Sequence, residues 1–288
     1  MSYNPYLFKK IYNSCSNIIN QTNDKNLKKK KKNLEFAYKR VQETDNCEIQ
    51  EFFSVAHELR TYELLKKLNK QVLANNDDKA GVDFVCNLGN IECVTFNMPK
   101  DDNSKKILNG NMNRYKAYEP RVSQAINEKL NKYRTYILKN QIDKNLPNII
   151  CLNSGICGYD IHSSTFLNAC ERIIYGLGDD TLFINRETKE EFWGRSFQDK
   201  IIKPNGKEIE TNLFSNKAYN IISGVLLIDN LVDENYSRPI LYINPNAKIK
   251  IDKRRVRKML CLIKDDELKY HYSCNGKLTS VNQYKGVK

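Results

Sequence analysis

The stretch at residues 80–97, AGVDFVCNLGNIECVTFN, decides what fold this chain can adopt. Valine, isoleucine, phenylalanine, cysteine and threonine fill both halves, and Asn-Leu-Gly-Asn interrupts them, which predicts two short strands joined by a tight loop. Each half also contains one acid, Asp83 in the first and Glu92 in the second. A carboxylate among apolar strand residues is costly to bury unless a cation or a hydrogen-bond donor accompanies it. These two acids are therefore the first candidates for a functional site.

The register of this hairpin decides whether the two acids meet. If residues 86–89 form the loop, Asp83 lies opposite Glu92, with Cβ atoms about 5 Å apart, close enough to share a divalent cation. If Gly89 and Asn90 form the turn instead, Asp83 pairs with Phe96 and the acids lie roughly 13 Å apart along the strand. Both registers place the acids on the same face of the sheet, and the sequence leaves the choice open.

A wider pattern of residues surrounds the hairpin. Glu58 on a predicted helix, Gly-Val-Asp at 81–83 and Ile-Glu-Cys-Val at 91–94 together resemble the PD-(D/E)XK, or restriction-endonuclease-like, nuclease superfamily. The resemblance covers roughly residues 50–155. It implies an α/β fold with a central mixed β-sheet flanked by helices, and an enzyme that hydrolyses the phosphodiester bonds of nucleic acid. It further implies that Asp83 and Glu92 hold Mg²⁺ or Mn²⁺ and that Glu58 assists them.

One position departs from the family pattern, because Val94 stands where the motif lysine would fall. Some members carry that lysine on another element, and Lys129 is the candidate here, since Arg121, Ala125 and Lys129 recur every four residues on one face of a predicted helix. Two other interpretations stay open. The chain is a catalytically inactive member of the fold that binds nucleic acid or a protein partner, or it is an unrelated interaction protein whose two acids are structural, capping backbone groups or pairing with Arg121.

The net charge of +13 over 288 residues favours polyanionic partners, either nucleic acid or an anionic membrane surface. Lysine, asparagine and isoleucine are abundant throughout, which indicates an A·T-rich coding sequence and accounts for part of this charge. The run of five lysines at 28–32 is either a contact for such a partner or a solvated linker or helix face, and we favour the second. The candidate nucleic-acid-binding residues are Arg114, Lys116, Arg121, Gln124, Arg254 and Arg255.

The cysteines and histidines follow no metal-binding spacing. The chain has nine cysteines without a Cys-x-x-Cys pair, and three histidines, so ligand spacing argues against a zinc site. Cys86, Cys93 and Cys151 lie in apolar runs and are expected to be buried, reduced thiols, which suits a cytoplasmic protein. The N-terminus lacks the pattern of a signal peptide, and the longest apolar run, 221–228, is too short to span a bilayer.

The apolar runs and basic clusters divide the chain into a basic helical extension at 1–47, a single domain at 48–250 and a basic extension at 251–288. The resemblance implies that the middle region is a PD-(D/E)XK-like domain. The predicted helices are 3–22, 34–41, 48–69, 121–139 (begun by Pro120), 163–175 and a basic one from Lys253 through Ile263. The predicted strands outside the hairpin are 71–74, 149–152, 181–184, 221–228 and 239–243. Residues 275–288 are expected to form a polar tail.

Overall fold

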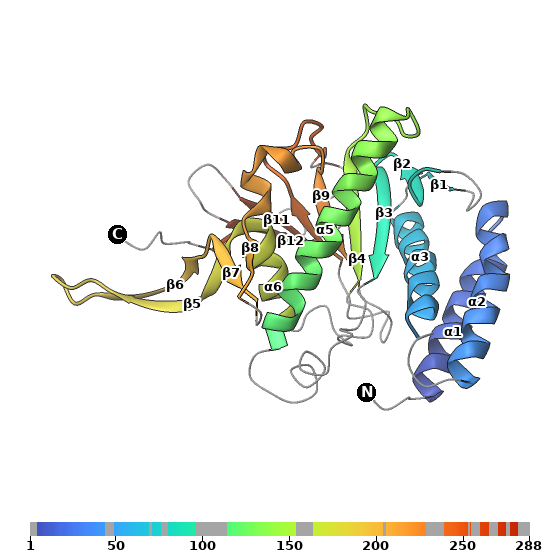
Figure 1. The fold of residues 1–288 in the computed structure, drawn as a ribbon, viewed down its shortest axis with the longest axis horizontal. Coiled ribbons are helices and arrows are strands. Elements are labelled where there is room, and N and C mark those ends of the chain that lie inside the picture. Colours follow the sequence, from blue (N-terminus) through green and yellow to red (C-terminus); the bar gives the residue numbers. More distant parts are fainter. Residues whose placement is uncertain are drawn as a thin grey trace.

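The computed structural model describes residues 5–43, 49–68, 71–75, 80–95, 114–153, 164–203, 206–228, 239–252, 254, 260–264, 270–274 and 277–281. The helices in this part of the chain are α1 (Pro5–Gln21), α2 (Lys25–Glu43), α3 (Ile49–Lys67), α5 (Arg114–Leu138), α6 (Ser164–Tyr175) and the short 3₁₀ helices η2 (Leu213–Ser215) and η3 (Lys217–Tyr219). Figure 1 shows α5 and α6 in front of a central sheet, α3 beside β3, and α1 and α2 beyond α3.

A nine-stranded mixed sheet runs through the molecule in the order β1-β2-β3-β4-β9-β10-β11-β12-β13. Its strands are β1 (Val72–Ala74), β2 (Phe84–Cys86), β3 (Gly89–Thr95), β4 (Asn148–Asn153), β9 (Gly224–Leu227), β10 (Ile240–Ile243), β11 (Leu260–Lys264), β12 (Tyr270–Cys274) and β13 (Lys277–Val281). β3, β4 and β9 run parallel to one another, whereas β2 is antiparallel to β3 and β10 is antiparallel to β9. The expected α/β architecture, with a mixed sheet flanked by helices, is therefore confirmed.

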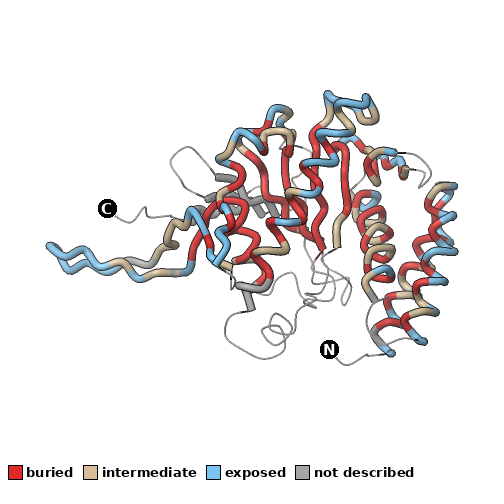
Figure 2. The backbone as a smooth tube through the Cα atoms, in the orientation of Figure 1, coloured by how far each residue is buried: buried red, intermediate tan, exposed pale blue. Residues whose placement is uncertain are grey.

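Two hairpins lie outside the central sheet. They are formed by β5 (Leu177–Ile184) with β6 (Glu191–Phe197), and by β7 (Lys200–Ile202) with β8 (Glu208–Glu210). The first hairpin projects far from the rest of the molecule, and its outer half is exposed (Figures 1 and 2).

The central strands β3, β4, β9 and β10 consist largely of buried residues (Figure 2), and they contribute to two core clusters. In β4, Ile149 and Cys151 belong to a core cluster shared with α1, α2 and α3, while Ile150 and Leu152 belong to a second cluster shared with α5 and α6. This division follows from the alternation of side chains along a strand, and a strand buried on both faces needs an unbroken apolar sequence. The continuous apolar run at 149–152 therefore predicted β4 correctly.

The five-lysine run at 28–32 belongs to α2, in agreement with a helix-face interpretation rather than a linker. Leu27, Leu34 and Ala37 bury the inner face of this helix against α1 and α3. Lys30 lies on that inner side and is only 8% exposed. Its ammonium group therefore needs a partner inside the molecule, which is described below.

Helix α5 begins earlier than the sequence suggested. We placed Pro120 at its first turn, but the helix starts at Arg114 and contains Pro120 within it. A proline inside a helix forfeits one backbone hydrogen bond. Burial of the neighbouring Tyr118 and Val122 in the second core cluster offsets that cost. Further along the helix, the hydroxyl of Tyr133 donates to the carbonyls of Asn90 and Ile149 and so fixes α5 against β3 and β4.

The helix predicted at 253–263 was wrong over its last residues, and residues 253 and 255–259 lie outside the described part of the chain. Residues 260–264 form β11, which pairs in parallel with β10, and 277–281 form β13 rather than a tail. Short apolar runs such as Leu-Cys-Leu-Ile fit a strand as well as a helix, and pairing with the open edge of β10 decides between them. These three C-terminal strands extend the central sheet.

Buried ion pairs join α5, α6 and β5. The guanidinium group of Arg172 in α6 binds the carboxylates of Glu119 and Asp179, and both Arg172 and Glu119 are almost fully buried. A buried carboxylate that loses its cation is strongly destabilising.

We predict that Arg172→Met lowers the free energy of unfolding by about 3–5 kcal/mol, because the Glu119 charge would stay buried after its counter-ion is removed. Urea unfolding measures this loss. Arg186→Met, in the exposed turn of the projecting hairpin, is the matched control and should change stability by less than about 0.5 kcal/mol. Equal effects of the two substitutions would contradict the importance of the buried pair.

Candidate functional site

The hairpin takes the register that brings the two acids together. Val85 pairs with Asn90 and Phe84 with Ile91, so the next position along the hairpin places Asp83 beside Glu92. Gly89 helps to fix this register, because a Cβ atom there would lie 2.2 Å from the carbonyl oxygen of Pro147. The alternative turn at Gly89 and Asn90 is not formed.

Asp83 lies at the point where the β2–β3 ladder ends. Its Oδ2 atom accepts a hydrogen bond of 2.6 Å from the backbone N–H of Cys93. This side-chain bond takes the place of the next backbone bond between the two strands. Burial, together with the negative charges of Glu58 and Glu92, raises the pKa of Asp83 to about 7, although Lys129 acts in the opposite direction. Glu58, Glu92 and Lys129 therefore all lie within electrostatic reach of Asp83.

Glu92 is buried in β3 and is neutralised from α5. The Lys129 ammonium group lies 2.5 Å from Glu92 Oε2, and the Lys132 ammonium group lies 3.6 Å from the same oxygen. A hydrogen bond also joins the Tyr136 hydroxyl to Glu92. Burial would lower the pKa of Lys129, but the carboxylates of Glu92 and Asp83 raise it above its usual value, so Lys129 remains charged at neutral pH.

Glu58 comes from the opposite side of β3, on α3. Its Oε2 atom lies 2.5 Å from the ammonium group of Lys30 in α2. The cation that pairs with Glu58 therefore belongs to the five-lysine run. The N-terminal helices thus contribute a charge to the neighbourhood of Asp83.

The structure brings together the four predicted catalytic residues Glu58, Asp83, Glu92 and Lys129. Val94, at the family's lysine position, packs against the second core cluster. The lysine nearest Glu92 is the one we predicted from the four-residue spacing on α5. Lys129 and Lys132, rather than Arg121, are the cations beside Glu92, whereas Asp83 does cap a backbone N–H group, as the structural interpretation of the acids expected.

Three residues of this site escaped the sequence analysis: Lys30, Lys132 and Tyr136. Lys129, Lys132 and Tyr136 recur at helical spacing on one face of α5, and this stripe could have identified the last two. Lys30 had no such signal, because it is one of five consecutive lysines.

The predicted nucleic-acid-binding residues, unlike the predicted catalytic residues, do not all come together in one place. Arg121 is half-buried on α5, and Gln124 is exposed there and donates to Glu128. Arg254 is exposed and pairs with Asp252 at 3.0 Å. The side chains of Arg114 and Lys116, and all of Arg255, lie outside the described residues.

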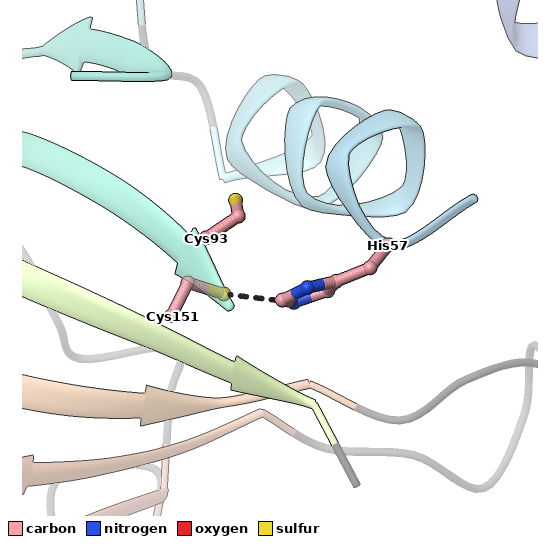
Figure 3. A group of neighbouring side chains, drawn as sticks. All are labelled: His57, Cys93 and Cys151. Atoms are coloured by element: carbon pink, nitrogen blue, oxygen red, sulfur yellow. Dashed lines mark hydrogen bonds between the residues drawn. The ribbon is translucent and has the colours of Figure 1, made fainter. Parts of the chain in front are cut away.

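A second cluster lies on the other face of β3. His57, Cys93 and Cys151 are buried there, with their ligand atoms all within 4.8 Å of one another (Figure 3). Burial alone would raise the pKa of the Cys151 thiol, but hydrogen bonding to Cys93 and the nearby His57 and Thr61 lower it to about 5. The spacing argument against zinc missed this group, because its members come from α3, β3 and β4 and are far apart in the sequence.

The carboxylate group has the donor set that Mg²⁺ or Mn²⁺ prefers, namely oxygen atoms. The hydrogen bond and ion pairs described above use Oδ2 of Asp83 and Oε2 of both glutamates, and each carboxylate has a second oxygen. A bound divalent cation would also relieve the repulsion that raises the pKa of Asp83. Asp83 and Glu92 therefore offer suitable donor atoms for such an ion, with Glu58 as a third acid, although in the described part of the chain only His57, Cys93 and Cys151 bring three ligand atoms within 4.8 Å of one another.

Comparison with known proteins gives no family assignment: no family model, curated protein or solved structure matches this chain. None of the helices in the described part of the chain has both the length and the apolar character needed to cross a bilayer. The function must therefore be inferred from the geometry and chemistry of the site itself.

We predict that Asp83→Asn stabilises the metal-free protein more at pH 8 than at pH 5. Since the folded state raises the pKa of Asp83 to about 7, the unfolded chain ionises this carboxyl first as the pH rises, and the folded state loses stability up to about pH 7. Asparagine has no charge to bury, so the variant avoids that loss. Thermal unfolding in EDTA should show its melting temperature rising above that of the wild type by at least about 2–4 °C at pH 8.

Asp143→Asn, at an exposed turn, is the control for this measurement and should show no comparable pH-dependent gain. A difference between Asp83→Asn and wild type that stays constant from pH 5 to pH 8 would contradict the raised pKa.

Proposed function

We propose that this chain is a metal-dependent nuclease of the restriction-endonuclease-like fold, with Glu58, Asp83, Glu92 and Lys129 at its active site. The observation that carries the proposal is the accumulation of three carboxylates around Asp83, from α3, the start of the hairpin and β3, with a charged lysine beside them. Glu92 is buried and Glu58 and Asp83 are half-buried, and carboxylates gathered in this way are typical of a site that binds a cation.

The order of the elements supports the finer fold assignment. An acid-bearing helix (α3) precedes the hairpin β2–β3, and helix α5 and the core strand β4 follow it. This is the order in which the resemblance places the helix acid, the aspartate, the second acid and the next helix and strand. β3 and β4 then pair in parallel at the centre of the mixed sheet.

The residues of the site have distinct roles in the proposed reaction. Asp83 and Glu92, assisted by Glu58, would hold Mg²⁺ or Mn²⁺. Such an ion, when bound, polarises the scissile phosphate and lowers the pKa of its water. Because the neighbouring carboxylates raise the pKa of Lys129, this residue keeps its proton and acts by stabilising negative charge rather than as a general base.

The overall charge of the chain suits a polyanion. The net charge of +13 favours nucleic acid, and contacts from basic side chains to the phosphate backbone bind without reading sequence. Arg121 lies on the same helix as Lys129 and is the candidate for such a contact from the described part of α5.

We predict that the wild-type protein cleaves nucleic acid in Mg²⁺ or Mn²⁺ and that Asp83→Asn, Glu92→Gln and Lys129→Met each slow cleavage by at least about a hundredfold. The first two remove cation ligands, and the third removes the charge that stabilises the reacting phosphate. Single- and double-stranded DNA and RNA should be assayed as substrates, with and without EDTA.

The matched controls are Glu187→Gln and Lys139→Met, which change exposed side chains away from the site and should leave the rate unaffected. Cleavage that survives Asp83→Asn, or that continues in EDTA, would refute the proposed site.

The second candidate function is binding without catalysis. Lys129 and Lys132 already neutralise Glu92, Lys30 neutralises Glu58, and Val94 replaces the family lysine. These ion pairs would let the site persist without a metal, as in an inactive nuclease-fold protein that binds nucleic acid or a protein partner. For that function we expect no cleavage of any substrate, and nucleic-acid binding that weakens in salt and is unaffected by EDTA.

A further inference from the structure

Three potential metal ligands converge from three elements on the face of β3 that packs against α3. His57 comes from α3, Cys93 from β3 and Cys151 from β4, and all three are buried (Figure 3). Cys93 and Cys151 are direct partners in the parallel β3–β4 ladder, so the sheet itself holds their side chains next to each other. The position of this cluster is therefore set by the rigid core rather than by a loop.

The separations within the cluster suit a tetrahedral ion. His57 Nε2 lies 3.4 Å from Cys151 Sγ, and in Figure 3 the imidazole ring points at this sulfur. Zinc bound to both atoms with its usual bond lengths would hold them about 3.5 Å apart. The ligand atoms of all three residues already lie within 4.8 Å of one another, so small side-chain rotations complete the site.

Two threonines support this arrangement. The Thr61 hydroxyl contacts both sulfurs, at 3.5 Å from Cys151 and 3.6 Å from Cys93, and donates its own proton to the His57 carbonyl. Its oxygen lone pairs therefore face the space between the two sulfurs. The Thr95 hydroxyl lies 3.4 Å from His57 Nδ1, which orients the ring so that Nε2 faces the cysteines.

We propose that His57, Cys93 and Cys151 bind one Zn²⁺ ion, with the Thr61 hydroxyl or a water molecule at the fourth position. Two thiolates and an imidazole select zinc over the hard ions that suit the carboxylate site. Both cysteines would bind the ion as thiolates.

Zinc binding would also affect the neighbouring carboxylate site, because His57 and Cys93 are directly linked to its acids. His57 precedes Glu58, and the backbone N–H of Cys93 binds the Asp83 carboxylate. A zinc ion that joins α3 to β3 and β4 would therefore fix the positions of Glu58 and Asp83. Only this consequence rests on the proposed nuclease function; zinc binding itself does not.

Titration of the full-length, reduced, metal-free protein with Co²⁺ tests the proposal, because Co²⁺ reports thiolate ligation by absorption. We expect thiolate-to-cobalt charge-transfer bands that saturate at about one equivalent and are displaced by Zn²⁺. Zn²⁺ should also raise the melting temperature of the protein. These measurements use the wild-type chain and need no variant that might misfold.

Cys93→Ser and Cys151→Ser should each weaken or abolish the charge-transfer bands. Cys170→Ser is the matched control, because Cys170 is a buried cysteine in the other core cluster. Asp83→Asn should keep the bands, which separates failure of this site from failure of the nuclease site. The proposal is overturned if wild type gives no charge-transfer band, if Cys93→Ser and Cys151→Ser bind Co²⁺ as wild type does, or if mass analysis finds Cys93 and Cys151 joined in a disulfide.

Discussion

The hydrogen bond between the Asp83 carboxylate and the backbone N–H of Cys93 is the interaction on which the site depends. The β2–β3 ladder reaches its last pair at Phe84 and Ile91, and beyond it β3 would present an N–H group without a strand partner. The aspartate satisfies that group, and its half-buried carboxylate is thereby held within electrostatic reach of Glu58 and Glu92. The same contact therefore completes the sheet and creates the electrostatic cost that a bound cation would relieve.

Alternation of side chains along β3 places two different sets of potential metal ligands on opposite faces of the strand. Glu92 faces α5 and its lysines, while the next residue, Cys93, faces His57 on α3. Oxygen ligands gather at the end of the hairpin and sulfur and nitrogen ligands gather in the core behind it, so hard and soft cations would be separated by a single strand. Helix α3 contributes to both groups through the adjacent residues His57 and Glu58.

The sequence predicted the parts of the structure that depend on local patterns. Strand β4 was clear from its apolar run, and the spacing along α5 singled out Lys129. The hairpin register could not be chosen, because it depends on contact between Gly89 and Pro147, which are far apart in the chain. The pairing of Lys30 with Glu58 and the meeting of His57 with Cys93 and Cys151 were missed for the same reason. Strand β11 was mistaken for a helix, because pairing with β10 decides its conformation.

The central claim is that the carboxylates around Asp83 form a site for a divalent cation, and Mn²⁺ titration calorimetry tests it most directly. We expect the wild-type protein to bind Mn²⁺ at a site that is lost in Asp83→Asn and Glu92→Gln but retained in Cys151→Ser, because thiolates contribute little to binding this hard ion. Mn²⁺ binding that is identical in wild type and in both carboxylate variants would contradict the account.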